Sequence, residues 1–259
     1  MTVEVLVIGI GSGNPDHLTG EAVAALNRVD VFLAADKSGP GTHDLVELRA
    51  EICRRLIGHD RYRFAAVPDP ERGPDRDRTG PDYRAGVAAW HRARAERYAE
   101  IIRSEVGEHG TVGFLVWGDP AFYDSTIRIV ESVAAAGIDL AMTVIPGISS
   151  IQLLAARHRI VLNRVGRPIH VTTGRRLAEE YDPALGDVVV MLDGDVACAG
   201  LVEDHPDLEI FWGAQLGLPD EVLVRGRLVE MLPTIRERRA AVRSARGWVM
   251  DTYLLRPPD

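Results

Sequence analysis

Short runs of β-branched and aliphatic residues alternate with longer helical stretches in the first half of the chain, and this alternation constrains the fold more than any other feature. The expected strands are residues 3–8, 31–34, 62–66 and 111–116. The strongest expected helix is residues 83–108, where apolar side chains recur on one face at Val87, Trp90, Tyr98, Ile101, Ile102 and Val106. Such alternation predicts a mostly parallel sheet covered by helices.

A second series of expected strands follows at shorter intervals, over residues 140–145, 168–173, 187–192, 208–212, 221–230 and 247–255. Short intervals leave room for hairpins, so the second sheet is expected to be mixed. A chain of 259 residues can bury two cores. We therefore expect two α/β domains, residues 1–118 and 119–259, with a cleft between them. Residues 68–83, rich in proline, glycine and charge, predict a loop.

The charge of the chain narrows the classes of partner. The formal net charge of −8 at pH 7 disfavours a nucleic-acid binder with a uniformly basic surface. No apolar run is long enough to span a membrane and no secretory signal pattern is present, so we expect a cytoplasmic protein without membrane contact. Cys53 and Cys198 lie far apart and no HExxH spacing occurs, so neither a disulfide nor a metal site is indicated.

The first strand runs into the glycine-rich segment GIGSGNPDHLT. A dinucleotide-binding fingerprint needs G-x-G-x-x-G leading straight into a helix. Gly9 and Gly11 fit this pattern, but Asn14 stands in the place of the third glycine. Thr19 is the better helix N-cap, which leaves a long loop before the helix. The segment is therefore either a ligand-binding loop of another kind or a plain turn.

Two later segments repeat the arrangement of a strand followed by a loop of small residues and a helix. They are GFLVWGDPAFYDST, residues 113–126, and VIPGISSIQLLA, residues 144–155. Ligands of open α/β sheets bind beyond the carboxyl ends of the strands, so three such loops can line one site. Taken singly, Gly-Asp-Pro is usually a turn and Ser-Ser before a helix is usually a cap.

In this order and spacing the three loops resemble those of the tetrapyrrole methylase family. The family's first loop, G-x-G-P-G-D-x-x-x-L-T, is similar to residues 9–19; its G-G-D-P is similar to residues 117–120; its P-G-[IV]-[ST]-[SA] is similar to residues 146–150. The strand VVVMLDG and the segment GAQLGLPDEVLVRGRL resemble later parts of the family pattern. The departures are Ser12 for proline, Asn14 for aspartate and Trp117 for the first glycine.

The resemblance implies a two-lobed fold and methyl transfer from S-adenosyl-L-methionine, with S-adenosyl-L-homocysteine as the second product. The form of the first two loops, together with the middle segment YRAGVAAWHRARAERYAEII, is most similar to the branch that methylates precorrin-5 at C1 and releases acetate. This implies a role in cobalamin biosynthesis, an anionic tetrapyrrole substrate in a cleft beside the cofactor, and a homodimer. Another precorrin methyltransferase of the family is the alternative within this class.

The resemblance also implies site residues. The cofactor is expected to contact Trp117, Gly118, Asp119, Ser149, Ser150, Met191 and Ala214. The substrate is expected to contact Gly11, Ser12, Asn14, Arg157 and Arg164, the arginines because their planar donors suit carboxylates. A group that activates water for loss of the acetyl group is expected among Asp16, His91 and Tyr123. The arginine-rich segment, residues 236–246, is interpreted as an exposed helix face.

Two functions of other classes stay open at this point. An NAD-dependent oxidoreductase would use the glycine-rich loop with Asp36 as the ribose-binding acid. A non-catalytic nucleotide-binding protein would bind the cofactor without turnover. Sequence alone does not separate these from the methyltransferase.

Overall fold

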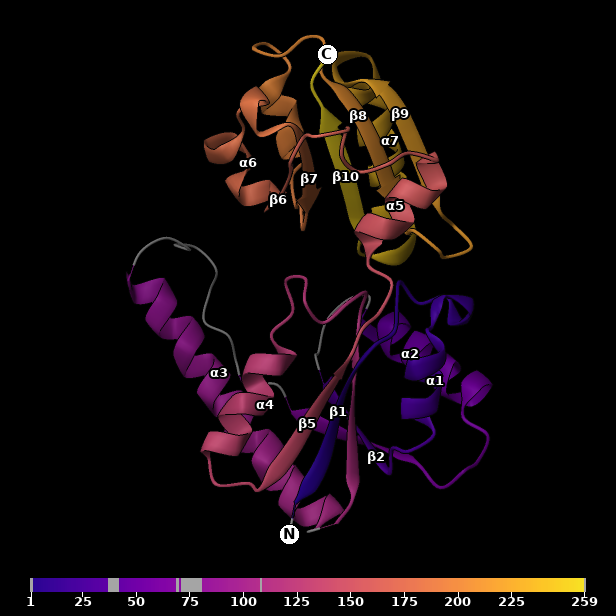
Figure 1. The fold of residues 1–259 in the computed structure, drawn as a ribbon, viewed down its shortest axis with the longest axis vertical. Helices are drawn as coiled ribbons and strands as arrows, with labels where there is room; N and C mark the ends of the chain where they lie inside the picture. Colours follow the sequence, from indigo (N-terminus) through magenta and orange to yellow (C-terminus); the bar gives the residue numbers. More distant parts are fainter. Residues whose placement is uncertain (1, 37–41, 69, 71–80, 108, 259) are drawn as a thin grey trace. The chain divides into compact units, whose positions relative to one another are not determined.

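The computed structural model describes residues 2–36, 42–68, 70, 81–107 and 109–258 (Figure 1). The chain divides into two compact units, Met1–Ile148 and Ser149–Asp259. The sequence placed the division after residue 118. The actual division falls later because residues 119–148 supply a helix and a strand to the first sheet.

The first unit is built on a parallel sheet, which confirms the expected fold class. Its described strands are β1 (Val3–Gly9), β2 (Val31–Asp36), β3 (Arg63–Pro68), β4 (Thr111–Val116) and β5 (Leu140–Ile145). They lie in the order β3-β2-β4-β1-β5, and all the pairings are parallel. Strand β5 was expected in the second sheet, but it pairs with β1 from Val3 opposite Leu140 to Ile8 opposite Ile145.

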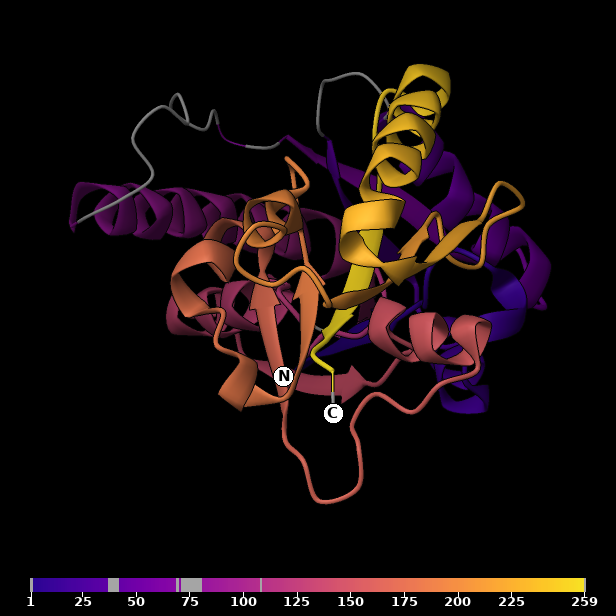
Figure 2. The ribbon, with the colours of Figure 1, turned by 90° about the horizontal axis from the view of Figure 1, so that it is seen from above.

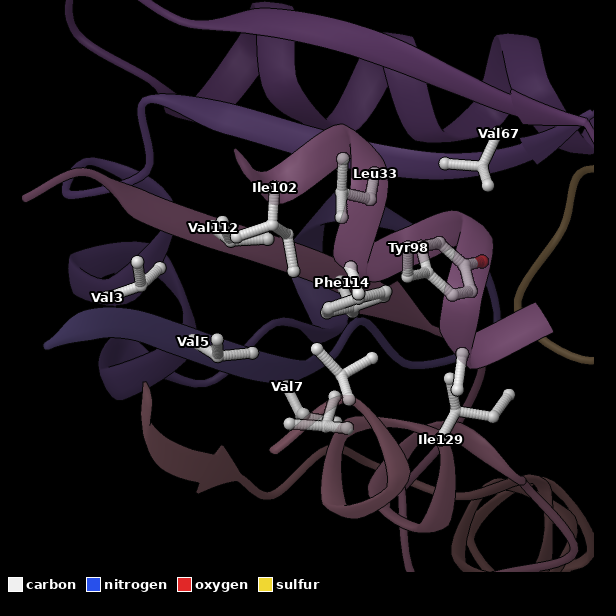
Figure 3. Close-up of a cluster of buried hydrophobic side chains, with 14 of the residues drawn as sticks. Val3, Val5, Val7, Leu33, Val67, Tyr98, Ile102, Val112, Phe114 and Ile129 are labelled. Atoms are coloured by element: carbon white, nitrogen blue, oxygen red, sulfur yellow. The ribbon is translucent and has the colours of Figure 1, made fainter. Parts of the chain in front are cut away.

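Helices cover both faces of this sheet because the strands are apolar on both faces. One face carries α3 (Pro81–Ile101), its π-helical extension Ile102–Val106, and α4 (Thr126–Ala135). Figure 3 shows their core, in which Val5, Tyr98 and Phe114 pack together. The other face carries α1 (Gly20–Leu26) and α2 (Thr42–Leu56), packed on Leu6, Ile8 and Leu115. The expected long helix is thus confirmed, and Tyr98 on α3 and Ile102 on its extension are buried as expected.

The second unit is built on the expected mixed sheet. Its described strands are β6 (Ile169–Thr173), β7 (Asp187–Met191), β8 (Glu209–Ala214), β9 (Val222–Arg227) and β10 (Asp251–Arg256). Their order is β6-β7-β10-β8-β9; β6 and β7 run parallel, and the other pairings are antiparallel. The hairpin of β8 and β9 is the closely spaced pair that the sequence predicted.

Helices lie on both faces of this second sheet as well. The face of Val188, Trp212 and Tyr253 is covered by α6 (Gly174–Glu180), the short helix Ala197–Leu201 and α7 (Leu228–Arg246). Helix α5 (Ser150–His158) lies on the opposite side of the strands from α7 (Figure 2). The predicted loop of residues 68–83 falls mostly outside the described residues. In the described ranges no helix is long and apolar enough to cross a membrane.

Candidate functional site

Three glycine-containing loops meet at the carboxyl ends of β1, β4 and β5. The amide of Gly11 donates to the carbonyl of Gly118 at 3.2 Å, and the amide of Gly118 donates back at 2.6 Å. Gly9 packs so closely on the third loop that a Cβ there would lie 2.5 Å from the amide nitrogen of Gly147. The sequence predicted that these loops share one edge, and the structure confirms it.

The close packing of the loops is enough to explain why glycines stand at these positions, so a bound dinucleotide is not needed as the reason. Gly11 and Gly118 have φ of 65° and 64°, a region that favours glycine, and they touch each other through their backbones. A 3₁₀ turn, Pro15–His17, separates the glycines from α1, which begins at Gly20. The tight strand-to-helix turn of the dinucleotide fold is therefore absent from this segment, which disfavours the oxidoreductase.

The carboxylate of Asp119 fastens the second loop to the third. Its Oδ2 accepts a hydrogen bond from the amide of Gly147 at 2.9 Å, and its Oδ1 accepts one from the amide of Ala121 at 2.8 Å. Both carboxylate oxygens therefore accept hydrogen bonds from backbone amides of the loops. Asp119 shapes the loop edge that the resemblance assigns to the cofactor.

Asn14 and Asp16 have different partners in the first loop. The Oδ1 of Asn14 accepts from the amide of Asp16 at 2.9 Å and so caps the 3₁₀ turn. An amide oxygen serves this purpose as well as the carboxylate oxygen of the family pattern would. Asp16 forms an ion pair with Arg55 at 2.6 Å, and both side chains are more than half exposed. An exposed carboxylate that is already held by an arginine is poorly placed to act as a general base.

His91 and Tyr123 lie on different elements of the first unit. His91 is on α3, where its ring centroid is 5.1 Å from that of Trp90 in an edge-on contact. Tyr123 is in the loop before α4, is 47% exposed and has a φ of 52°. A left-handed backbone at an aromatic residue is uncommon and costs energy, so the surrounding loop holds the backbone of Tyr123 in this conformation.

Ser149 and Ser150 begin the second unit at the N-terminus of α5. Ser149 is buried and caps the helix as the sequence predicted, and it forms a capping box with Gln152. The hydroxyl of Ser150 accepts a hydrogen bond from Thr252 Oγ1 on β10 at 2.9 Å. The pair therefore joins α5 to one end of the second sheet.

Met191 and Ala214 lie at that same end of the sheet. Met191 ends β7 opposite Thr252, and Ala214 ends β8 opposite Asp251, the neighbour of Thr252 on β10. The register therefore brings Ser150, Met191 and Ala214 around one end of β10, although 64 residues separate the outer two (214 minus 150). Three of the predicted cofactor residues thus form one group.

Gln215 belongs to this group but was not predicted from the sequence. It is 1% exposed, has a φ of 53°, and its Oε1 accepts from the amide of Met250 at 3.0 Å. Its Nε2 is buried and has no hydrogen-bond partner among the described residues. A buried amide donor without a partner is costly, so a ligand that accepts from it would be favoured.

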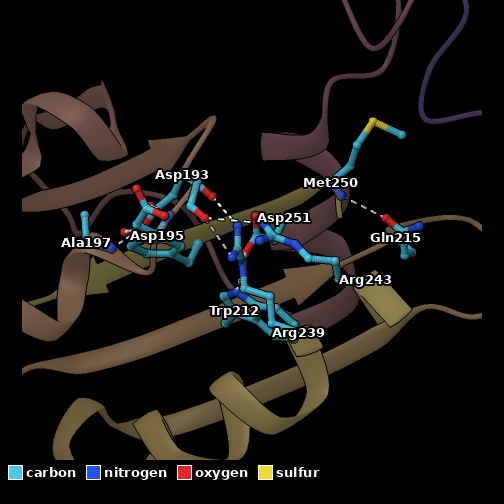
Figure 4. A network of polar contacts seen from close by, with 11 residues as sticks. Asp193, Asp195, Ala197, Trp212, Gln215, Arg239, Arg243, Met250 and Asp251 are labelled. Carbon is cyan, nitrogen blue, oxygen red and sulfur yellow. Dashed lines mark hydrogen bonds and ion pairs between the residues drawn. The ribbon is translucent and has the colours of Figure 1, made fainter. Parts of the chain in front are cut away.

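A polar network lies beneath the loop after β7 (Figure 4). Arg239 of α7 donates to the carbonyl oxygens of Asp193 at 2.5 Å and Gly194 at 2.9 Å, and it pairs with Asp251 at 2.9 Å. Tyr253 donates to the carboxylate of Asp193 at 2.6 Å. Burial raises the pKa of Asp251, and the nearby charge of Arg239 opposes that shift. This network fixes a loop that begins with Leu192, exposed and with a φ of 52°.

The predicted substrate arginines are paired inside the second unit. Arg157 forms an ion pair with Glu221 at 2.9 Å, and Arg164 lies 3.5 Å from the buried carboxylate of Asp187. Arg239, which the sequence placed on an exposed helix face, is 8% exposed. This interpretation was wrong for Arg239 because its guanidinium has buried carbonyl and carboxylate partners that the sequence does not reveal.

One arginine of the first unit lies beside the end of β4 and the loop that follows it. Arg49 of α2 donates to the carbonyl of Leu115 at 3.3 Å, and its guanidinium lies 5.0 Å from the ring centre of Trp117. Burial lowers the pKa of Arg49 to about 10, which leaves it charged at neutral pH. No sequence pattern indicates a role for Arg49, because arginines on helices usually face water.

The family model for tetrapyrrole (corrin/porphyrin) methylases matches residues 4–232. A precorrin-6A synthase [deacetylating] from Sinorhizobium sp is 48% identical over 254 residues, which are 98% of this chain and 95% of that protein. A crystal structure of a cobalamin synthesis related protein (CobF) from Corynebacterium diphtheriae superposes with a TM-score of 0.84 and 37% identity, covering all of both chains. A uroporphyrin-III C-methyltransferase from Thermus thermophilus, complexed with S-adenosyl homocysteine, shares the fold with a TM-score of 0.58 and 18% identity, over 97% of this chain and 91% of that one.

Proposed function

The chain belongs to the tetrapyrrole (corrin/porphyrin) methylase family, and from that membership we propose that it methylates precorrin-5 at C1 and releases the acetyl group as acetate, giving precorrin-6A. The observation that carries this proposal is the near full-length similarity to a deacetylating precorrin-6A synthase. In the balanced reaction, precorrin-5, S-adenosyl-L-methionine and water give precorrin-6A, S-adenosyl-L-homocysteine and acetate.

We propose that the group at the end of β10 holds S-adenosyl-L-methionine, with Ser149, Ser150, Met191 and Ala214 in contact with it. The partnerless Nε2 of Gln215 and the apolar side chain of Met191 suit a nucleoside with nitrogen and oxygen acceptors. The sulfonium supplies an activated methyl group. The protein then has chiefly to align the acceptor carbon and exclude water, a task that needs few catalytic side chains.

At the edge of the first sheet, we propose that backbone groups of Trp117, Gly118 and Asp119 contact the cofactor. Those of Gly11, Ser12 and Asn14 are proposed to contact the substrate. These groups are fixed in advance by the Gly11–Gly118 bridge and the Asp119 carboxylate. Fixed donors stabilise a ligand without reorganisation when it binds. A cytoplasmic homodimer is the setting that the family resemblance implies, and light scattering coupled to gel filtration tests the dimer.

Two measurements test the proposal. A thermal-shift comparison should show stabilisation by S-adenosyl-L-homocysteine and none by NAD. Mass spectrometry of an anaerobic incubation with precorrin-5 and S-adenosyl-L-methionine should then show a product that has gained the methyl group and lost the acetyl group. Stabilisation by NAD alone would favour the oxidoreductase, and cofactor binding without any product would favour a non-catalytic nucleotide-binding protein.

The release of acetate, which follows methyl transfer, can be tested separately with variants of His91 and Tyr123. If His91 or Tyr123 assists water or the departing acetyl group, His91→Ala or Tyr123→Phe should slow acetate release more than methyl transfer, by roughly 100-fold for loss of acid–base assistance. A methylated intermediate that still carries its acetyl group should then accumulate in the mass spectrum. His109→Ala is the matched control because His109 is exposed on the turn before β4. If both variants slow methyl transfer and acetate release equally, neither residue acts specifically in the release of acetate.

A further inference from the structure

Arg49 differs from the other arginines of helix α2 in the groups that surround its guanidinium. Arg54 forms ion pairs with Glu47 and Glu51, and Arg55 pairs with Asp16. Within the part of the chain that the structure describes, no carboxylate forms an ion pair with Arg49. Its hydrogen bonds go instead to two neutral carbonyls, those of Leu115 at 3.3 Å and Leu45 at 3.2 Å, and its guanidinium lies over an indole ring. The carboxylate of Asp124 favours its charge electrostatically but forms no ion pair with it.

A cation in such surroundings is only partly satisfied. Burial of the guanidinium is unfavourable and lowers the pKa of Arg49, and the charge of Asp124, the carbonyl dipoles and the indole ring return only part of that loss. The two hydrogen bonds use Nε and Nη1. The donors on Nη2 form no hydrogen bond within the described ranges, so they are available to an acceptor.

The position of Arg49 places this charge at the edge where ligands of such sheets bind. Leu115 is the last residue but one of β4, and Trp117 directly precedes Gly118 of the loop bridge. Trp117 replaces the first glycine of the family's G-G-D-P, so the stacking surface for Arg49 is a departure of this chain from the family pattern.

Two further polar atoms at the same edge lack partners. The hydroxyl oxygen of Ser12 and the indole Nε1 of Trp117 are buried and form no hydrogen bond with any residue that the structure describes. Ser12 follows Gly11 and Trp117 precedes Gly118, so both flank the bridge between the two loops. Buried donors without a partner indicate an acceptor that is not part of the protein.

We propose that Arg49, stacked on Trp117, forms a subsite for one side-chain carboxylate of the tetrapyrrole. This inference rests on the proposed function and names a residue that positions its substrate. Arg157 and Arg164 are already paired with Glu221 and Asp187, so they would have to break an ion pair to do the same. Arg49 has no ion pair to break among the described residues, and a substrate carboxylate would supply a directly bonded counter-charge in addition to the electrostatic effect of Asp124.

The test compares two variants of Arg49 with a matched control. Arg49→Gln removes the charge but keeps a donor for the Leu115 carbonyl, and Arg49→Lys keeps the charge but removes the planar fork. Arg54→Gln is the control, an exposed arginine on the same helix. Each protein is assayed for the KM of precorrin-5, the Kd of S-adenosyl-L-homocysteine, the thermal midpoint, and the Kd of uroporphyrin, a fluorescent polycarboxylate tetrapyrrole.

We expect Arg49→Gln to raise the KM of precorrin-5 and the Kd of uroporphyrin by roughly 10- to 100-fold, the effect of losing one charge-assisted pair. Arg49→Lys should raise both by less, and the Kd of S-adenosyl-L-homocysteine should stay at the wild-type value in all the variants. Unchanged tetrapyrrole constants in Arg49→Gln overturn the subsite. So does an equal loss in Arg54→Gln, or an equal weakening of the cofactor, which would mark Arg49 as a brace between α2 and β4.

The two proposals fail in different ways. If the wild-type protein turns over no precorrin-5, the proposed function is wrong, while the uroporphyrin comparison still decides the subsite. If precorrin-5 is converted and Arg49→Gln behaves as wild type toward both tetrapyrroles, only the subsite is wrong.

Discussion

Gly147→Ala is expected to cripple the enzyme, because the added methyl group has no space at the junction of the three loops. A Cβ at Gly147 would overlap the carbonyl oxygen of Gly118 and lie 2.8 Å from the carbonyl carbon of Gly9. These are backbone atoms, which cannot rotate away as a side chain can. The loops must part, and a displacement of about 1 Å at such a site is expected to lower kcat/KM by roughly 100-fold.

The same substitution should also lower stability. Forcing a methyl group into a packed region typically costs about 1–3 kcal/mol, and a clash with backbone belongs at or above the upper end. The control is Gly20→Ala at the start of α1, where a Cβ meets no atom within 4 Å. Urea unfolding and calorimetry with S-adenosyl-L-homocysteine provide the readouts. Wild-type stability and cofactor affinity in Gly147→Ala would show that the junction does not shape the site.

Arg239→Met is expected to produce the largest loss of stability in the second unit. It would leave the buried carboxylate of Asp251 without its counter-charge and two carbonyls of the loop after β7 without a donor. Breaking a buried ion pair on one side costs about 3–5 kcal/mol. Arg243→Met is the matched control, because Arg243 lies on the same helix but is exposed and donates a long, 3.4 Å hydrogen bond to the carbonyl of Gly194.

The pH dependence of the stability of Arg239→Met shows whether the loss comes from the uncompensated charge of Asp251. Burial already raises the pKa of Asp251, and removing Arg239 removes the charge that opposes this shift. A carboxyl group whose folded-state pKa lies above its unfolded value is neutral in both states at low pH, and it destabilises the fold as the pH rises through that interval. The stability gap between the variant and the wild type should therefore narrow as the pH falls toward 4. A gap of the same size at every pH would assign the loss to packing instead.

The sequence predicted the strands of both sheets and the three loops because local patterns encode them. Apolar runs mark buried parallel strands, and glycine and proline mark the loops that follow them. It did not predict that β5 pairs with β1, because residues 140–145 contact a strand more than 130 positions earlier (140 minus 3) and no local pattern identifies that partner. Because residues 140–145 were assigned to the second sheet, the predicted domain boundary was placed too early, after residue 118.

The candidate site was predictable only in part, for a physical reason. Gly118 and Asp119 follow a strand of the first sheet, and Met191 and Ala214 end strands of the second, so within each sheet the topology brings the predicted positions to one end. The roles of Arg49 and Arg239 depend on which helix packs against which strand. A buried arginine and a solvated one have the same local sequence, so only the fold distinguishes them. Gln215 is similar, because its burial follows from its contact with Met250 across the sheet.

The central claim is that one protein both methylates the tetrapyrrole and releases acetate. It is tested most directly by incubating the protein with precorrin-5 and S-adenosyl-L-methionine labelled with ¹³C in its methyl group, and by following the three products in one time course. We expect acetate and S-adenosyl-L-homocysteine to form in equal amounts, with the ¹³C label at C1 of a tetrapyrrole that has lost its acetyl group. S-adenosyl-L-homocysteine without acetate, or the label on another carbon, would show instead that the chain is a different methyltransferase of the family.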